Sequence, residues 1–314
     1  MNEIIPITGP VIVLVGPTAI GKTALSLDLA NQFDCEIISV DSMQVYRLMD
    51  IGTAKASLEE RAKVPHHLID VVDPDEEYDA ARFVRDASAA IREIHGRGRV
   101  ALLTGGTGLY LRGLFHGLFQ DIATDLNIRE QLKDELTLLG NNKLHEELKV
   151  IDQISAKRIH PNDSQRLVRA LEIYRSTGKT WSEHLHEHDQ QRHKRFTNSL
   201  QIGLTCDRKI LHERINLRTR IMLNQGLEQE VLSLLERGYK ADLKSMQSIG
   251  YRHMNEYLQG KYDRNECERL LARDTRRYAK RQYTWFSSNK EIQWHEASAR
   301  DTVLKKTEDW IRRI

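Results

Sequence analysis

The strongest chemical signal in the sequence is a glycine-rich octapeptide near its start. It matches the phosphate-binding pattern G-x-x-x-x-G-K-[ST] through Gly16, Pro17, Thr18, Ala19, Ile20, Gly21, Lys22 and Thr23. The glycines allow backbone N–H groups to turn toward phosphate oxygens, and a following helix directs its positive dipole end to the same point. Lys22 adds a charge, and the Thr23 hydroxyl suits a phosphate-bound Mg²⁺. This octapeptide, here called the P-loop, predicts a diphosphate or polyphosphate site; a turn without a ligand is the alternative.

A lone acidic residue follows the next predicted strand. Asp41 comes directly after residues 36–40, where a carboxylate could coordinate a metal, cap the next helix or accept a proton. The third predicted strand, residues 100–104, runs into Gly105, Gly106 and Thr107 without the carboxylate with which P-loop nucleotidases hold their metal. This difference argues against ATP hydrolysis.

The elements that must position these residues alternate along the chain. Residues 11–15 form an apolar run typical of a strand buried on both faces, and residues 24–32 and 80–95 show helical spacing. The pattern predicts an α/β fold with a P-loop NTPase-like parallel sheet. Helical patterns fill residues 121–199, a strand returns at 200–205, and helices follow. We therefore expect a catalytic core of residues 1–120 and 200–314 and a helical insertion domain of residues 121–199.

The composition is that of a globular protein. Of 314 residues, 29% are charged and 40% hydrophobic, and 47 basic against 45 acidic residues leave a net charge of +2. Binding of nucleic acid would therefore need a local concentration of basic residues. No apolar run approaches the about 20 residues of a membrane-spanning helix. Cys35, Cys206 and Cys267 fit neither a zinc spacing nor a disulfide framework, which favours a reducing cytoplasm.

Seven sequence blocks resemble the tRNA dimethylallyltransferase (tRNA isopentenyltransferase) family and follow the family's order. They are residues 41–47 (DSMQVYR), 50–55 (DIGTAK), 65–70 (PHHLID), 105–110 (GGTGLY), 165–172 (QRLVRALE), 248–252 (SIGYR) and 279–286 (AKRQYTWF). Seven blocks in register are far more specific than the P-loop alone. No zinc-finger extension follows the last block, so we expect the bacterial type of this enzyme.

The resemblance implies transfer of a dimethylallyl group from dimethylallyl diphosphate to the exocyclic amine of the adenosine on the 3′ side of the anticodon in tRNA, giving isopentenyladenosine. The leaving diphosphate would be stabilised by the P-loop, by Mg²⁺ at Thr23 and by Arg218, which matches the family's diphosphate-binding arginine. Asp41 matches the family's catalytic aspartate, a general base, and Thr107 matches a threonine beside the reacting groups. Without the resemblance, Arg218 also fits a solvated helix arginine and Thr107 a turn residue.

Two groups of basic residues could contact the tRNA anticodon stem-loop. Arg269, Arg273, Arg276 and Lys280 lie within roughly 60° of one another on a predicted helix, and Arg166 and Arg169 lie one turn apart on another. The resemblance places tRNA contacts on both groups and at Arg129; without it, solvated helix faces are the favoured interpretation. The expected tRNA-binding residues are Asp41, Ser42, Met43, Gln44, Thr107, Arg129, Gln165, Arg166, Leu167, Val168, Arg169, Gln247, Ser248, Ile249, Gly250, Tyr251, Arg252, Arg276, Lys280, Arg281, Gln282, Tyr283, Thr284, Trp285, Phe286 and Ser287.

Other features leave alternatives open. His184, His186, His188 and His193 lack partners at metal-ligand spacing, so an exposed loop is favoured over a metal site. A small-molecule P-loop kinase using ATP would share the P-loop and Mg²⁺ but would not need the insertion or the basic helix. A non-catalytic RNA-binding module is a third interpretation. The favoured hypothesis is a cytoplasmic, monomeric prenyltransferase that does not bind membranes.

Overall fold

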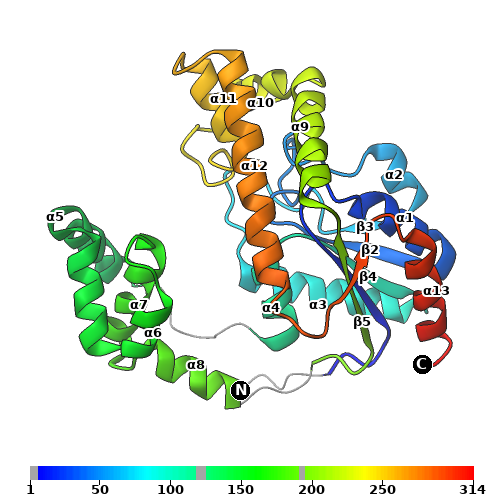
Figure 1. The fold of residues 1–314 in the computed structure, drawn as a ribbon, viewed down its shortest axis with the longest axis horizontal. Coiled ribbons are helices and arrows are strands. Elements are labelled where there is room, and N and C mark those ends of the chain that lie inside the picture. Colours follow the sequence, from blue (N-terminus) through cyan, green and yellow to red (C-terminus); the bar gives the residue numbers. More distant parts are fainter. Residues whose placement is uncertain (1–5, 118–124, 191–194) are drawn as a thin grey trace. The chain divides into compact units, whose positions relative to one another are not determined.

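One parallel sheet of six strands organises most of the chain (Figure 1). The structure is a computed structural model and describes residues 6–117, 125–190 and 195–314. The strand order is β3-β2-β4-β1-β5-β6. The strands are β1 (Val11–Val15), β2 (Cys35–Val40), β3 (His66–His67), β4 (Val100–Gly105), β5 (Ser199–Thr205) and β6 (Gln293–Glu296). The expected α/β fold with a parallel sheet is confirmed.

The register of the central strands brings the chemical residues to one edge. Val15 at the end of β1 pairs with Gly105 of β4, and Val40 at the end of β2 pairs with the same glycine. Because parallel strands end at the same edge, the segments that follow β1, β2 and β4 emerge side by side. These segments are the P-loop, the segment beginning at Asp41 and the segment containing Thr107.

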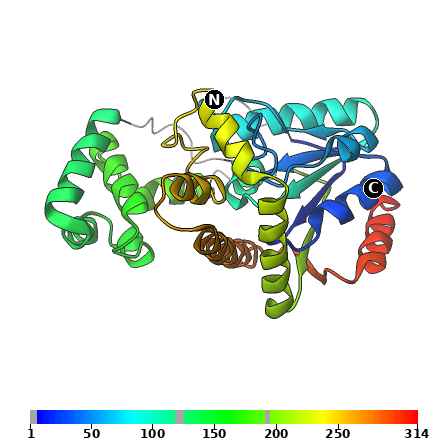
Figure 2. The same cartoon turned by 90° about the horizontal axis from the view of Figure 1, so that it is seen from above.

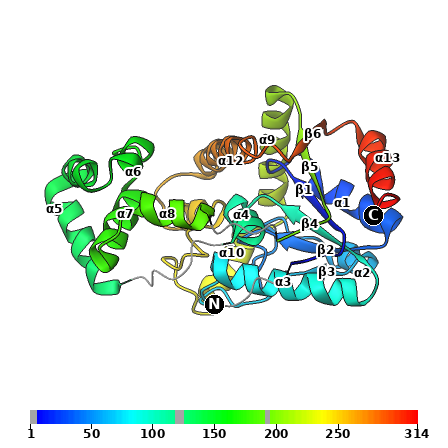
Figure 3. The ribbon, with the colours of Figure 1, turned by 90° about the horizontal axis from the view of Figure 1, so that it is seen from below.

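Helices cover both faces of the sheet, as Figure 3 shows for α3 and α1. Alternate residues of β1 belong to different cores: Val13 packs in the cluster that contains Phe83 of α3, and Leu14 in the cluster that contains Leu29 of α1. This alternation explains why the β1 sequence is apolar throughout. The helices of this first group are α1 (Lys22–Phe33), α2 (Leu58–Lys63), α3 (Ala80–Gly96), α4 (Gly108–His116) and α13 (Arg300–Ile311).

A second group of helices lies beyond the carboxyl ends of the strands. Two of them, α9 and α12, lie side by side (Figures 1 and 2). Leu211 and Ile215 of α9 pack in the same core cluster as Ala279 of α12. The helices of this group are α9 (Arg208–Asn224), α10 (Leu227–Glu236), α11 (Tyr251–Leu258) and α12 (Arg264–Phe286).

The chain divides into two compact units, Met1–Phe115 with Lys194–Ile314, and His116–His193. The boundary expected at residue 120 lies outside the described residues. The second unit consists of α5 (Leu126–Ile151), α6 (Gln153–Arg158), α7 (Ser164–Thr177) and α8 (Trp181–Gln190). Its core contains Leu132 and Leu144 of α5 and Leu167 and Leu171 of α7. Gly140, with a φ of 79°, interrupts α5.

The histidine-rich segment differs from the expected loop. His184 and His186 lie within α8, which begins at Trp181. Thr180 and Glu183 exchange hydrogen bonds of the capping type: Glu183 Oε2 accepts from Thr180 N at 2.8 Å, and Thr180 Oγ1 accepts from Glu183 N at 3.2 Å. The expectation of a loop was wrong here because this capping pair starts a helix. His193 lies outside the described residues.

Candidate active site

The P-loop forms one wall of a cavity of about 640 Å³ at the carboxyl edge of the sheet. The loop requires its glycines: Gly16 has a φ of 148°, and a Cβ there would lie 2.9 Å from the Leu204 carbonyl oxygen. Gly21, with a φ of 108°, precedes the first residue of α1. The amino end of α1, with Lys22 and Thr23, therefore opens into the cavity.

Among the cations that line this cavity are two from distant parts of the chain, Lys22 and Arg218 of α9. Lys22 Nζ donates to the carbonyl oxygens of Gly16 and Pro17, both at 2.9 Å. Burial and the charge of Arg218 lower the pKa of Lys22 to about 7, against the opposing effect of Asp41. Burial also lowers the pKa of Arg218. Within the described part of the chain, the Arg218 guanidinium has neither an ion pair nor a hydrogen-bond partner. A cavity with two partly desolvated cations is suited to a polyanion.

Asp41 faces the same cavity and is held by its own turn. Its Oδ1 accepts hydrogen bonds from Met43 N at 2.8 Å and Gln44 N at 3.3 Å. This is an aspartate turn rather than a helix cap, because no helix begins at this point. The turn fixes the direction of the carboxylate near the two cations.

Thr107 lies next to Asp41 because β2 and β4 are adjacent. The Thr107 hydroxyl accepts from Ser42 N at 3.1 Å, and Gly106 N and Thr107 N both donate to the Val40 carbonyl oxygen at 3.1 Å. A Cβ on Gly105 would lie 2.1 Å from that oxygen, so the close approach of the two strand ends requires a glycine.

Two residues of α12 complete this wall of the cavity. Gln282 Oε1 accepts from Thr18 N at 2.8 Å, and its Nε2 donates to the Gly106 carbonyl oxygen at 3.1 Å. Tyr278 lines the cavity one helical turn earlier. Burial and the charge of Asp41 raise the pKa of Tyr278, while hydrogen bonds with Thr107 and Gln282 oppose this shift.

Sequence reasoning missed Tyr278 and Arg214 as residues of the site. Arg214, one turn before Arg218, lines the cavity and donates to the Ile20 carbonyl oxygen at 3.0 Å. The spacing of four residues between Arg214 and Arg218 was the available signal. For Tyr278 the signal was its position one turn before Gln282.

The segment before α11 also lines the cavity, through Gln247, Ser248 and Ile249. The next residues serve the framework. Tyr251 is fully buried, and its hydroxyl donates to Glu230 Oε1 at 2.5 Å. Arg252 pairs with Asp274 of α12 at 3.2 Å.

The basic residues of α12 divide into paired and unpaired cations. Arg269 pairs with Glu266 at 2.6 Å, and Arg273 and Arg277 pair with Asp274 at 2.9 and 3.3 Å. Arg276 hydrogen-bonds the neutral Asn216 at 2.5 Å and has no acidic partner in the described part of the chain. No acidic partner of Lys280 or Arg281 is found among the described residues. The last turn alternates between exposed Thr284, Trp285 and Ser287 and buried Phe286, while the Tyr283 hydroxyl lies 3.2 Å from Thr205 Oγ1.

In the second unit, two expected tRNA contacts meet at one buried carboxylate. Arg129 of α5 and Arg169 of α7 both pair with Glu172, at 3.0 and 3.1 Å, and the Glu172 side chain is fully buried. Arg166 is exposed and pairs with Asp163 at 2.9 Å. Gln165, beside it, is also exposed. Leu167 and Val168 are buried in the core of this unit.

A bound Mg²⁺ would find oxygen donors in the cavity. The described residues contain no group of three or more histidine, cysteine or acidic side chains able to hold a metal by themselves. The Thr23 hydroxyl and the Asp41 carboxylate both line the cavity. Hydroxyl and phosphate oxygens suit a magnesium ion that arrives with its diphosphate.

Family models and curated relatives agree on what the chain resembles. Residues 44–289 match the model described as IPP transferase, and residues 9–70 match isopentenyl transferase. The tRNA dimethylallyltransferase of Desulfotalea psychrophila is 55% identical over 302 residues, which is 96% of both chains. That of Heliobacterium modesticaldum is 49% identical over 92% of this chain and 90% of the relative.

Solved structures agree with the sequence matches. The full-length tRNA isopentenylpyrophosphate transferase of Bacillus halodurans is 40% identical, has a TM-score of 0.71 and is covered over 97% of both chains. A eukaryotic dimethylallyltransferase acting on tRNA is 31% identical with a TM-score of 0.80, over 97% of this chain and 80% of that one. A P-loop cavity that contains a carboxylate is typical of enzymes that act on phosphate or diphosphate compounds, and the comparisons show which family of such enzymes this is. The chain belongs to the tRNA dimethylallyltransferase family. None of these comparisons favours the kinase alternative.

Proposed function

We propose that the protein transfers a dimethylallyl group from dimethylallyl diphosphate to the exocyclic amine of the adenosine on the 3′ side of the anticodon in tRNA. The observation that carries this proposal is the Arg218 guanidinium, which has no acidic partner among the described residues and shares one cavity with Lys22, the P-loop and Asp41. The cations would stabilise the negative charge of a leaving diphosphate, and the carboxylate would accept a proton from the amine. Membership of the tRNA dimethylallyltransferase family supports the choice of donor and acceptor.

The diphosphate end of the donor would bind to the P-loop. Departure of the diphosphate breaks the bond between the allylic carbon and oxygen and leaves negative charge on the phosphate oxygens. The P-loop N–H groups, Lys22 and Arg218 would stabilise that charge without rearrangement. A Mg²⁺ ion held by the Thr23 hydroxyl and phosphate oxygens would supply further neutralisation of the leaving group.

Asp41 would accept the proton that the adenine amine loses. As the nitrogen bonds to the allylic carbon, its N–H becomes acidic, and a general base within hydrogen-bond reach accelerates this step. The turn at Met43 and Gln44 holds the carboxylate, which supports the role. Thr107, which accepts a hydrogen bond from Ser42 N, would orient the amine or the diphosphate beside it.

The acceptor base would have to leave its stack to reach the cavity. Flipping a base costs a few kcal/mol, which contacts to the RNA backbone offset. On α12, the residues suited to phosphate contacts are Arg276, Lys280 and Arg281. The charges of Arg269, Arg273 and Arg277 on the same helix are already neutralised by acidic partners. Arg129, Arg166 and Arg169 are the candidates in the second unit. The buried side chains of Leu167, Val168, Tyr251 and Phe286 would hold these surfaces in place.

Two further proposals concern the protein as a whole. No helix among residues 6–117, 125–190 and 195–314 has the length and apolar character to cross a membrane. The three cysteines are free, and Cys35 and Cys267 are buried. We propose that the protein is a monomer and acts in the cytoplasm. Gel filtration with light scattering tests the oligomeric state.

The experiment that tests the proposed function offers the purified protein either dimethylallyl diphosphate or ATP, each with total tRNA. The proposal predicts prenylated adenosine in tRNA digests, seen by mass spectrometry, and release of pyrophosphate in equal amount. Phosphoryl transfer from ATP with no prenylated nucleoside would contradict it. A tRNA that lacks adenosine at the position after the anticodon is the matched control and should not react.

A further inference from the structure

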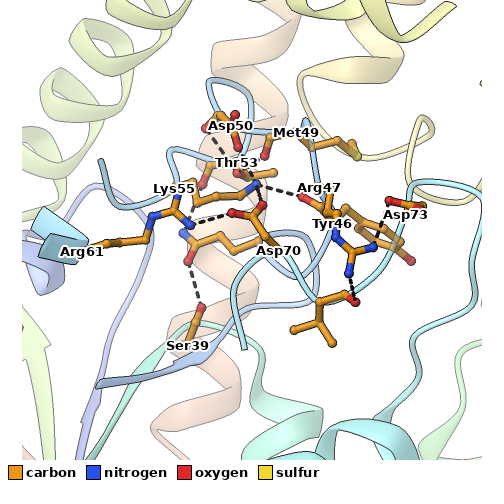
Figure 4. Close-up of polar contacts among 12 residues, drawn as sticks. Ser39, Tyr46, Arg47, Met49, Asp50, Thr53, Lys55, Arg61, Asp70 and Asp73 are labelled. Atoms are coloured by element: carbon orange, nitrogen blue, oxygen red, sulfur yellow. Dashed lines mark hydrogen bonds and ion pairs between the residues drawn. The ribbon is translucent and has the colours of Figure 1, made fainter. Parts of the chain in front are cut away.

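A buried charge cluster outside the proposed machinery surrounds Lys55, in the segment that follows Asp41 (Figure 4). The Lys55 side chain is 2% exposed, and Nζ lies 2.5 Å from Asp50 Oδ1 and 2.6 Å from Asp70 Oδ1. Asp70, three residues after the end of β3, also pairs with Arg61 of α2 at 2.6 Å. A buried ammonium is costly unless acceptors surround it, so this arrangement holds the segment in one conformation.

The third acceptor connects Lys55 to the turn of Asp41. Lys55 Nζ donates to the Tyr46 carbonyl oxygen at 2.8 Å, and Tyr46 N donates to the Met43 carbonyl oxygen at 3.2 Å. Met43 N in turn donates to Asp41 Oδ1. The ammonium is therefore linked by a short chain of hydrogen bonds to the backbone that orients the carboxylate.

A second link runs parallel to the first. Gln44 N donates to Asp41 Oδ1. The Gln44 side chain accepts from Ser39 Oγ at 2.8 Å and donates to the carbonyl oxygens of Thr53 and Ala54 at 3.3 and 3.4 Å. These two carbonyls immediately precede Lys55. Loss of the Lys55 clamp would therefore release both sides of the turn.

We infer that Lys55 is a positioning residue for the prenyl-transfer reaction: clamped between Asp50 and Asp70, it holds the 41–46 turn so that the Asp41 carboxylate faces the cavity. The inference rests on the proposed role of Asp41. A residue that acts in this way changes the rate of the bond-forming step only while Asp41 is present. A residue that merely stabilises the fold lowers the rate with or without Asp41.

The test is a double-mutant cycle on the single-turnover rate of prenyl transfer, with Lys55→Met, Asp41→Ala and the double variant. Lys55→Met keeps the length of the side chain and removes its charge. We expect Lys55→Met to slow the reaction about 10- to 100-fold in the wild-type background and less than about twofold in the Asp41→Ala background. The Kd values for the donor and for tRNA should stay within about threefold of wild type.

Arg47→Met is the matched control, because the Arg47 side chain comes from the same segment as Lys55 but binds residues 71–73. Its guanidinium binds Asp73 Oδ1 at 3.0 Å and the Val71 carbonyl oxygen at 2.8 Å, and among the described residues it donates no hydrogen bond directly to residues 41–46 (Figure 4). We expect it to keep the wild-type rate. Should Lys55→Met fail to fold, Asp70→Asn weakens the same clamp from the other side and should follow the same pattern.

The outcomes separate the two claims. An equal loss of rate from Lys55→Met with and without Asp41, or no loss at all, overturns the inference about Lys55. A full rate in Asp41→Ala alone overturns instead the proposed role of Asp41. A loss that appears only when Asp41 is present supports both.

Discussion

Gln282 of α12 accepts a hydrogen bond from Thr18 N of the P-loop at 2.8 Å, across 264 residues of sequence. The same side chain donates to Gly106, next to Thr107. A Cβ on Gly106 would lie 2.0 Å from Gln282 Nε2, so the glycine permits this approach. One carboxamide thus joins the diphosphate-binding loop to the end of β4.

Replacement of Gln282 should therefore weaken donor binding. Gln282→Leu leaves Thr18 N and the Gly106 carbonyl oxygen without their partner, at a cost of about 1–3 kcal/mol for each buried group. We expect the Kd for dimethylallyl diphosphate to rise about tenfold, measured by calorimetry. Gln293→Leu, on the exposed end of β6, is the control and should bind the donor as wild type does. Unchanged affinity in Gln282→Leu would show that Gln282 does not support the P-loop in donor binding.

Glu172 should orient Arg129 and Arg169 for RNA. Glu172→Gln keeps the shape of the side chain and removes the charge that both arginines share. Because Glu172→Gln removes the carboxylate that two half-buried guanidinium groups share, we expect a lower melting temperature as well as weaker tRNA binding. The Kd for dimethylallyl diphosphate should stay unchanged.

The control for Glu172 is Glu135→Gln in the same unit. Glu135 pairs with Arg175 at 2.8 Å, and Arg175 also pairs with Glu147. Arg175 is not an expected tRNA contact, so this variant should lose stability without losing tRNA affinity. Equal tRNA affinity in both variants, with both folded, would show that Glu172 has only a structural role.

The unpaired cations of α12 should contribute more to tRNA binding than the paired ones. We expect Lys280→Ala to weaken binding and to reduce the slope of log K against log salt by about 1, as loss of one phosphate contact requires. Arg269→Ala removes a charge that Glu266 already neutralises and should change the slope much less. Filter binding at several salt concentrations measures both slopes. The same slope change in the two variants would contradict the distinction.

Binding of the diphosphate should take up a proton at alkaline pH. Burial and Arg218 lower the pKa of Lys22 to about 7, so the free protein loses this charge as the pH rises above 7. An arriving diphosphate favours the charged form and raises the pKa again. Affinity should therefore be highest below pH 7 and fall above it, by up to about tenfold per pH unit.

Calorimetric titration with pyrophosphate in two buffers of different ionisation enthalpy measures this uptake directly. At about pH 8.5 we expect close to one proton per site in the wild type and a clearly smaller value in Lys22→Met. A wild-type affinity that is constant across this range, with no proton taken up, would show that Lys22 keeps its charge in the free protein.

The local features of the fold could be predicted from the sequence. Helix α3 was expected at 80–95 and occupies Ala80–Gly96, and the strand expected at 100–104 occupies Val100–Gly105. These segments have the strong periodicity that burial on one or both sheet faces imposes. The two-residue strand β3 carries no such pattern, because its pairing with β2 involves only His66 and His67.

The convergence of distant residues could not be predicted from spacing. The resemblance indicated Arg218, whereas Tyr278 and Arg214 had only a helical spacing to Gln282 and Arg218, which does not show that they share its cavity. Tyr251 and Gln282 lie in blocks expected to bind tRNA, yet their side chains are buried and join elements of the fold. A sequence block that resembles a family does not separate the residues that face a ligand from those that support them.

The most direct test of the central claim is the single-turnover rate of prenyl transfer by Asp41→Asn, with both substrates saturating. The asparagine keeps the shape of the side chain and cannot accept the proton. We expect a rate lowered by about 10²- to 10⁴-fold, with the Kd values for tRNA and for dimethylallyl diphosphate within about threefold of wild type. A rate close to that of the wild type, in a variant with intact affinities, would contradict it.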